Sequence, residues 1–242
     1  IFLHDLQTHT TTRVSVAYNG AEADGQSSWF SISSDGRYVA FASWAPNLVL
    51  GDTNGNGDVF VRDRQLNTTT RVSVTSDNAE VSGNCVAPSI SASGRYVAFQ
   101  SVSDDLVASD NNSCEDMFVH DRQTGETARI SVSAGGDEGN DESMAPTTPP
   151  GGQCISADGQ YVAFRSRATN LVAGGTTGWQ FFVVQLTIES LADISADTTS
   201  YDFGTVAIGG SSDHTFTVSR RYGALVASPG GYPPLGPNVE SK

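Results

Sequence analysis

The chain has 242 residues, and 27 acidic against 13 basic residues give it a formal net charge of −14. A surface of that charge repels phosphate backbones and anionic lipid headgroups, so nucleic acid is excluded as an expected partner. No apolar run approaches the roughly 20 residues that span a bilayer, and we expect no membrane insertion. The 25 glycines, together with many Ser, Thr, Asn and Asp residues, favour short strands and tight turns over helices.

Three blocks of sequence recur along the chain. The first block is IFLHDL (1–6), VFVRDR (59–64) and MFVHDR (117–122), and the second is TTRVSV (11–16), TTRVSV (69–74) and TARISV (127–132), all with a spacing of 58 residues. The third block is SISSDGRYVAFAS (31–43), SISASGRYVAFQS (89–101) and CISADGQYVAFRS (154–166), with seven extra residues before its last copy. These extra residues fall around Thr147 to Gln153, in a Pro- and Gly-rich turn where a repeat tolerates insertion.

Each repeat is expected to form four antiparallel strands, a to d. A short strand ending in Ile-Ser leads to YVAF through a two-residue hairpin turn at Asp35-Gly36 or Asp158-Gly159, where positive φ angles are accessible. VFVRD and TTRVSV supply strands c and d. YVAF is apolar on both faces, as in a strand between two sheets, whereas VFVRD and TTRVSV contain polar residues, as outer strands do. The pattern predicts an all-β fold, a β-propeller of four-stranded antiparallel blades with a 58-residue period.

The elements SxDGRYVAFxS, NLVxGDTNxxxDVFVRD and TTRVSV resemble the TolB-like β-propeller repeats of secreted bacterial proteins, over residues 1–186. The resemblance implies a scaffold more than a chemistry. The chain supplies strands c and d first, then two complete units, then strands a to c of another. We therefore expect either a small ring of about four blades, closed by pairing of the termini with Leu191–Ser195 as strand d, or a fragment of a larger ring.

The repeat fades near Thr187, and residues 187–242 are expected to be closing strands or a truncated immunoglobulin-like segment. YDFGTVAIGGSSDHTFTVS (201–219) resembles the opening strands of Hydin-type immunoglobulin-like domains. The stretch from Arg220 to Lys242 has four prolines and no alternation of polar and apolar residues, which is typical of a linker or a frayed end.

Two loops between strands b and c contain oxygen-bearing side chains in an alternating pattern. In GDTNGNGD these are Asp52, Asn54, Asn56 and Asp58, and in SDNNSCED they are Asp110, Asn112 and Asp116. A short Gly-rich turn can direct several such oxygens at one calcium ion, which would stiffen the loop. The alternative is that Asp, Asn and Gly only form turns. The third copy, GGTTGWQF, has no carboxylate and no predicted site.

The cysteines predict one disulfide. Cys85 precedes strand a of the second unit and Cys114 lies in its b–c loop, and in a blade the d–a and b–c loops emerge on the same face. A Cys85–Cys114 bond is therefore expected, in an oxidising compartment. Cys154 is expected to be a small buried residue. Three free thiols in a reducing compartment are the alternative.

The recurrent charged residues are interpreted as scaffold, because a catalytic group is normally unique in a ring. His4 and His120 share a repeat position with Arg62 and are expected to face solvent. The arginines preceding strand d are expected to pair with the aspartates that end strand c: Arg13, Arg71 and Arg129 with Asp5, Asp63 and Asp121. We find no nucleophile elbow, phosphate loop or metal-binding histidine pair.

Three tryptophans depart from the repeat, and we consider Trp29, Trp44 and Trp179 as ligand-binding residues that could stack on sugars or anchor a protein. Core or loop packing is the alternative. The sequence favours a noncatalytic binding or structural module that is secreted, periplasmic or on the cell surface, with one loop face contacting protein or glycan. The alternatives are the propeller portion of a secreted hydrolase whose catalytic part lies elsewhere, and a subunit that self-assembles through sheet edges.

Overall fold

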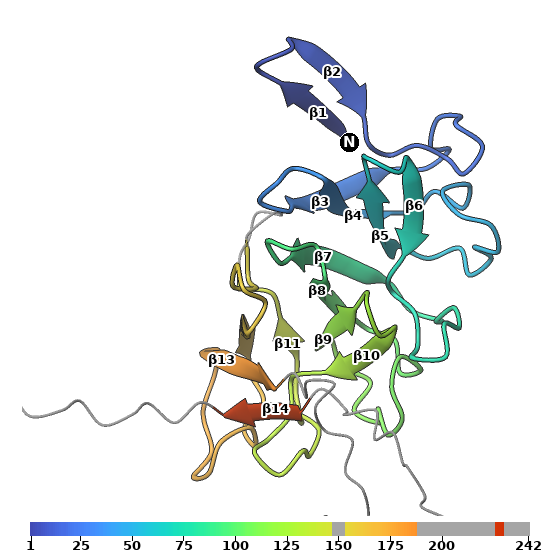
Figure 1. Ribbon diagram of the computed structural model, residues 1–242. Coiled ribbons are helices and arrows are strands. Elements are labelled where there is room, and N and C mark those ends of the chain that lie inside the picture. Colours follow the sequence, from blue (N-terminus) through green and yellow to red (C-terminus); the bar gives the residue numbers. More distant parts are fainter. Residues whose placement is uncertain (147–152, 188–225, 230–242) are drawn as a thin grey trace, which may run out of the picture. The chain divides into compact units, whose positions relative to one another are not determined.

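The computed structural model describes residues 1–146, 153–187 and 226–229, and every regular element in these ranges is a strand (Figure 1). Within the described ranges there is no helix of the length and apolarity needed to cross a bilayer. The strands are β1 (Phe2–Asp5), β2 (Thr10–Arg13), β3 (Ser27–Ile32), β4 (Tyr38–Ser43), β5 (Asp58–Asp63), β6 (Thr68–Arg71), β7 (Cys85–Ile90), β8 (Tyr96–Ser101), β9 (Asp116–Asp121), β10 (Glu126–Arg129), β11 (Ser143–Met144), β12 (Tyr161–Ser166), β13 (Gln180–Thr187) and β14 (Val226–Pro229).

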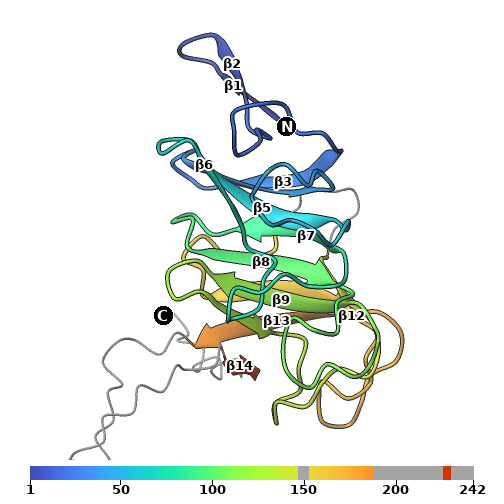
Figure 2. The same ribbon diagram turned by 90° about the vertical axis from the view of Figure 1, so that its right-hand side faces the viewer.

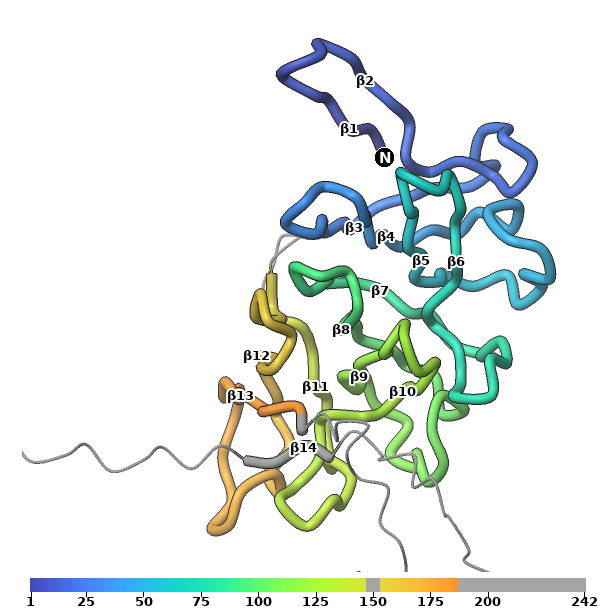
Figure 3. The backbone as a smooth tube through the Cα atoms, viewed as in Figure 1, coloured from blue at the N-terminus to red at the C-terminus, as the bar shows by residue number. Residues whose placement is uncertain are grey.

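The strands form one two-stranded and three four-stranded antiparallel sheets. Their orders are β1-β2, β3-β4-β5-β6, β7-β8-β9-β10 and β11-β12-β13-β14, so each sheet is a meander. We call them the first, second, third and fourth sheets, and Figure 3 follows the chain through them. This arrangement confirms the all-β fold, the four strands per repeat and the initial pair of strands c and d.

In the fourth sheet the strand d position, on the far side of β13 from β12, is taken by β14, and Val184 pairs with Pro229. The predicted strand d at Leu191–Ser195 and the immunoglobulin-like stretch at 201–219 lie outside the described residues. Because β14 belongs to the fourth sheet while β1 pairs with β2, the terminal strands of the described chain do not pair with one another. The described strands therefore do not close a ring, and closure through Leu191–Ser195 stays a prediction.

The turn between strands a and b is longer than predicted. Five residues, 33–37, connect β3 to β4, and only Gly36 has a positive φ, of 69°. The Ser33 hydroxyl donates to Asp35 Oδ1 at 2.6 Å and accepts the Tyr38 N–H at 2.9 Å. The side chains of the repeat motif thus close this turn internally, and Gly94 and Gly159, with φ of 75° and 76°, hold the equivalent positions.

The extra residues of the last repeat interrupt a strand and not a turn. In the second and third sheets, strand a contains an irregularity in register, between Ser28 and Phe30 and between Val86 and Ser89. In the fourth sheet, two separate segments pair with strand b, which is β12. Met144 of β11 pairs with Arg165, and Ile155 forms a bridge with Val162. The insertion therefore lies at the repeat position of a β-bulge, where the ladder is already broken and an added loop costs little pairing.

The sheets are stacked in chain order (Figure 2), and apolar side chains are buried between consecutive sheets. One cluster joins Ala40, Val59 and Val61 of the second sheet to Phe99 and Phe118 of the third. In the second and third sheets, strand c (β5 and β9) is therefore buried on both faces, and the expectation that it would be an outer strand was wrong there. Strand d is the outer strand, and all four residues of β2 are exposed.

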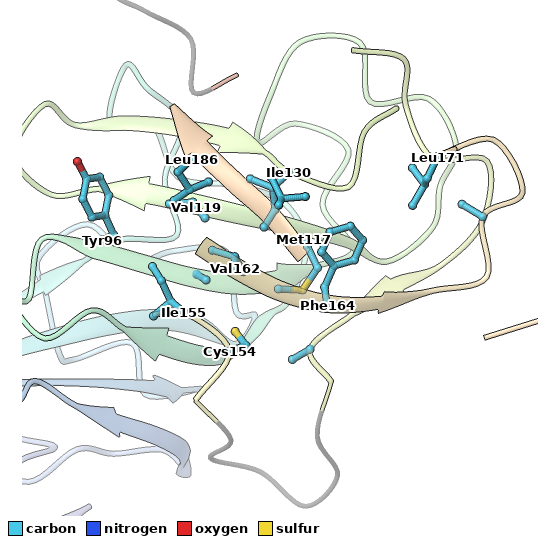
Figure 4. Packing of buried hydrophobic residues seen from close by; sticks show 14 residues of the cluster. Tyr96, Met117, Val119, Ile130, Cys154, Ile155, Val162, Phe164, Leu171 and Leu186 are labelled. Carbon is cyan, nitrogen blue, oxygen red and sulfur yellow. The ribbon is translucent and has the colours of Figure 1, made fainter. Parts of the chain in front are cut away.

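The interface between the third and fourth sheets repeats this packing. Met117 and Val119 of β9 meet Val162 and Phe164 of β12 in one buried cluster (Figure 4). Burying a side chain of this size stabilises the fold by about 1.5–3 kcal/mol. Because every internal sheet contributes two such faces, the fold depends on sheets being stacked in register.

In the third and fourth sheets, the glycine of the a–b turn lies on a tyrosine of the preceding sheet. A Cβ atom added to Gly94 would overlap the ring of Tyr38, and one added to Gly159 would overlap the ring of Tyr96. Arg122 covers the same Tyr38 ring at 4.6 Å from its centroid and donates to the Gly94 carbonyl at 2.6 Å. The repeat thus requires glycine here both for its backbone angle and for its lack of a side chain.

We predict that Gly94→Ala lowers the free energy of unfolding more than Gly36→Ala does. Both substitutions place a Cβ on a positive-φ backbone, which costs about 1 kcal/mol, but only Gly94 faces a ring, since the nearest atom to a Cβ on Gly36 lies 3.7 Å away. Overpacking should add about 1–3 kcal/mol to the Gly94 variant. Urea unfolding of the two variants measures the difference, and equal losses would contradict the contact with Tyr38.

Candidate functional site

Two equivalent clusters of carboxylates lie beside the b–c loops. Asp52, Asp58 and Glu80 bring carboxylate oxygens within 4.8 Å of one another, and Asp110, Asp116 and Glu138 do the same one repeat later. In each cluster one aspartate comes from the b–c loop, one begins strand c, and the glutamate lies between strands d and a. We call these the first and second acidic clusters.

An arginine at the end of strand d lies inside each cluster. Arg71 Nη1 is 2.6 Å from Glu80, 3.4 Å from Asp58 and 3.6 Å from Asp52. Arg129 Nη1 makes the same three contacts with Glu138, Asp110 and Asp116, at 2.6, 3.1 and 3.5 Å. The two arginine side chains are only 11% and 8% exposed, so each guanidinium acts as an internal cation shared by three carboxylates.

The predicted asparagine ligands bind the protein's own backbone. Asn54 Nδ2 donates to Asp58 Oδ2 and to the Val81 carbonyl, while its Oδ1 accepts the Asn56 N–H at 2.7 Å. Asn56 Nδ2 donates to the Ser82 carbonyl, and Asn112 in the second cluster donates to Asp116 and Gly139. These amides connect the b–c loop to the segment that leads into the next blade.

The pKa values of the cluster carboxylates are shifted in opposite directions. Desolvation and the nearby Asp58 raise the pKa of Asp52 to about 6, and desolvation likewise raises the pKa of Asp110. Glu80 is also desolvated, but hydrogen bonds from Thr53 and Arg71 outweigh this and lower its pKa to about 2. Three carboxylates with one guanidinium leave an excess of negative charge, which favours a proton or a further cation.

The glutamates were missed from the sequence, although a signal was present. Glu22, Glu80 and Glu138 recur with the 58-residue spacing, and each pairs with the arginine nine residues before it: Arg13, Arg71 or Arg129. The predicted pairing of these arginines with Asp5, Asp63 and Asp121 is wrong.

The aspartate that ends strand c pairs instead with the arginine that precedes strand b. Arg37 binds both Asp63 oxygens, with Nη2 at 2.7 Å, and Arg95 binds Asp121 in the same way. The Arg37 guanidinium and the backbone donors of Leu66 and Gln65 hold the pKa of Asp63 down at about 2. Strands b and c are neighbours, and Tyr38 is opposite Asp63, so this pairing follows from the register.

All three cysteines are free thiols, and the predicted Cys85–Cys114 disulfide is not formed. Cys85 is fully buried at the start of β7, with its Sγ 3.2 Å from the Ser101 hydroxyl, and desolvation raises its thiol pKa to about 12. Its thiol belongs to the apolar cluster between sheets, whereas Cys114 lies in a partly exposed loop. Cys154 is buried, as expected.

The two histidines at one repeat position differ in environment. His4 is exposed and its Nδ1 lies 2.8 Å from the Thr11 hydroxyl, as expected of a solvent-facing residue. His120 is only 6% exposed, so for this residue the expectation was wrong. Its ring contacts Thr127, which donates to the Val74 carbonyl of the preceding repeat, and desolvation lowers its pKa to about 4.

The structure separates the three tryptophans into a pair and a single residue. Trp29 lies at the bulge of β3, with φ of 42°, and its ring centroid is 5.6 Å from that of Trp44. Trp44 also covers Gly57, where a Cβ would come within 2.7 Å of the ring, so this pair packs within the second sheet. Trp179 is 40% exposed in the β12–β13 connection, with Arg165 and Arg167 at 4.7 and 5.7 Å from its ring.

The chain is similar to several solved structures at low sequence identity. It is similar to TolB from Acinetobacter baumannii, with 17% identity and a TM-score of 0.41 over 78% of this chain and 37% of that one. A putative TolB from Agrobacterium tumefaciens has 16% identity and a TM-score of 0.37, over 66% of this chain and 45% of that one. The tricorn protease has 12% identity and a TM-score of 0.44, over 96% of this chain and 20% of that one.

The chain thus spans less than half the length of these structures. It resembles TolB-like β-propellers, and the assignment of its blades rests on its own repeat and sheets. No protein-family model and no curated protein matches it.

We predict that Arg129→Met lowers the free energy of unfolding by about 3–5 kcal/mol, because it leaves buried carboxylates without their cation. Arg13→Met is the matched control at the same repeat position, where Arg13 and Glu22 are 35% and 73% exposed. The control should cost about 0–1 kcal/mol, as exposed pairs do. Denaturant unfolding of both variants measures these losses, and a small loss for Arg129→Met would show that the cluster does not depend on its guanidinium.

Proposed function

We propose that this chain is a noncatalytic β-propeller module that acts outside the cytoplasm, as a binding or structural part that contacts protein or glycan. One observation carries the proposal. The charged side chains that recur in the second and third sheets are engaged with one another, in the acidic clusters around Arg71 and Arg129 and in the Arg37–Asp63 and Arg95–Asp121 pairs. Groups held in this way serve the scaffold, so recognition is assigned to the residues that depart from the repeat.

Trp179 is the best candidate for such recognition. Its indole is 40% exposed, and the guanidinium groups of Arg165 and Arg167 flank it. An exposed indole stacks on a sugar ring or anchors a protein partner, and nearby guanidinium groups pair with carboxylates. This combination favours a carboxylate-bearing glycan or an acidic protein segment, because the two guanidinium groups place positive charge beside the indole.

We predict that Trp179→Ala weakens binding to the partner at least tenfold, as expected for a central aromatic residue worth about 2 kcal/mol. Glycan arrays and pull-down assays with the purified chain would identify the partner, and titration of the variants would give the affinities. Tyr18→Ala is the control, because Tyr18 is an exposed aromatic residue in another repeat. Unchanged binding by Trp179→Ala would reject this surface, and hydrolysis of a bound glycan would reject a noncatalytic role.

We also propose calcium as a stabiliser of the two b–c loops. The support for this is the excess of carboxylates over guanidinium in each acidic cluster, because hard oxygen ligands attract calcium. The residues that would hold it are Asp52, Asn54, Asn56 and Asp58 in the first loop and Asp110, Asn112 and Asp116 in the second. Glu80 and Glu138 would contribute to the same two sites.

Millimolar calcium is expected to raise the melting temperature, and a chelator to reverse the rise. A ligand at about 100 times its Kd stabilises the folded state by about 2.7 kcal/mol. The double variant Asp52→Asn, Asp110→Asn should lose the calcium-dependent rise, because each cluster loses a negative charge. Melting curves of the unsubstituted chain that coincide in calcium and in chelator would show that the arginines alone neutralise the clusters.

A further inference from the structure

One face of the fourth sheet is exposed although it is apolar. Tyr161, Ala163 and Arg165 of β12 lie on this face opposite Gln185, Val183 and Phe181 of β13. Phe181 is 73% exposed, Val183 60% and Tyr161 41%. We call this the open face. The opposite side of the same strands, with Val162, Phe164 and Val184, is buried against the third sheet.

The same face is buried in the second and third sheets. Its equivalents in the second sheet are Ala40, Val59 and Val61, and in the third Ala98, Met117 and Val119, all 1% exposed or less. Phenylalanines of the following sheet cover them, as Phe99 and Phe118 do for the second sheet and Phe164 does for the third. The two internal interfaces therefore show what chemistry fits the open face, which is the phenylalanine side of another sheet of this repeat.

The tyrosine of the repeat leads to the same conclusion. Tyr38 and Tyr96 each lie beneath a turn glycine of the following sheet, Gly94 or Gly159. Tyr161 holds the third equivalent position and is 41% exposed. Its ring is therefore available for contact with the turn glycine of another sheet of this repeat.

The first sheet exposes the complementary side. Phe2 holds the repeat position of Phe60 and Phe118, which are fully buried, yet Phe2 is 65% exposed. Phe60 packs against Ile1 and Leu3 of the preceding strand c, and Phe118 packs against Val59 and Val61. By the same register, the residues that fit Phe2 are the equivalents of Val59 and Val61, and in the fourth sheet these are Phe181 and Val183.

We infer that the occupant of the open face is a second copy of this chain, bound head to tail, with the Phe2 side of its β1–β2 sheet on Phe181 and Val183. This inference goes beyond the proposed binding module and uses the faces of sheets, not their edges. A single chain carries both halves of the contact, and each half repeats an interface found inside the chain. Such a contact is heterologous, so it closes into a ring or continues as a filament.

The test is sedimentation and light scattering of the purified chain over a range of concentrations. The unsubstituted chain should increase in mass with concentration. Phe181→Asp and Phe2→Asp should each weaken association at least tenfold, because either one removes one half of the contact. Both side chains are exposed, so the fold should persist, as circular dichroism would verify. Leu66→Asp is the matched control, since Leu66 is 64% exposed in the β5–β6 turn and should not affect association.

A mixture of the two variants distinguishes this contact from others. Phe2→Asp retains an intact open face and Phe181→Asp retains an intact Phe2 side, so an equimolar mixture should form a one-to-one dimer that neither variant forms alone. A contact between two identical faces would give no such recovery and would overturn the inference. A monomeric unsubstituted chain, or association that persists in both variants, would also overturn it.

Discussion

The stacking of one sheet's small aliphatic face on the next sheet's phenylalanine face is the constraint on which the rest of the structure depends. Val59 and Val61 meet Phe99 and Phe118, and Met117 and Val119 meet Phe164. An isolated meander of short strands has too little buried area to be stable in water. Each sheet is therefore stabilised by packing against the next, and an identical spacing of residues along the chain keeps the two packed faces in register.

That stacking also explains why charged residues are found so deep in the repeat. In the second and third sheets, strand c is buried on both faces, yet it begins and ends with aspartate. Asp58 and Asp63 of β5 are examples, and neither side chain is more than 7% exposed. Burial of an unpaired carboxylate is costly, so each aspartate has a guanidinium, from Arg71 or Arg37. Recurrence of these charges therefore reflects the cost of burial at the strand ends and does not indicate a catalytic function repeated in each blade.

The sequence predicts the strands well because the period repeats, but it predicts the contacts between strands less well. The pairing of Asp63 with Arg37 was missed because the two residues are 26 positions apart, and only the register of β4 on β5 brings them together. The burial of His120 could not be read from its repeat position, which it shares with exposed His4, because neighbouring segments determine it. For Cys85, the position of its loop suggested a disulfide, whereas its side chain points into the core.

In the last repeat the charge pair between strands b and c is lost, while the aromatic pair between the same strands is kept. Gln160 stands where Arg37 and Arg95 stand, and Gln185 where Asp63 and Asp121 stand, so both members of the charge pair are replaced together. A joint replacement leaves no buried unpaired charge, which is the costly outcome. The aromatic pair is retained, since Phe164 stacks on Phe182 at 5.4 Å. The fourth sheet therefore keeps its apolar packing although it lacks the Arg–Asp pair. Gln160 precedes β12 and Gln185 lies in β13, the strand that also carries the exposed Phe181 and Val183.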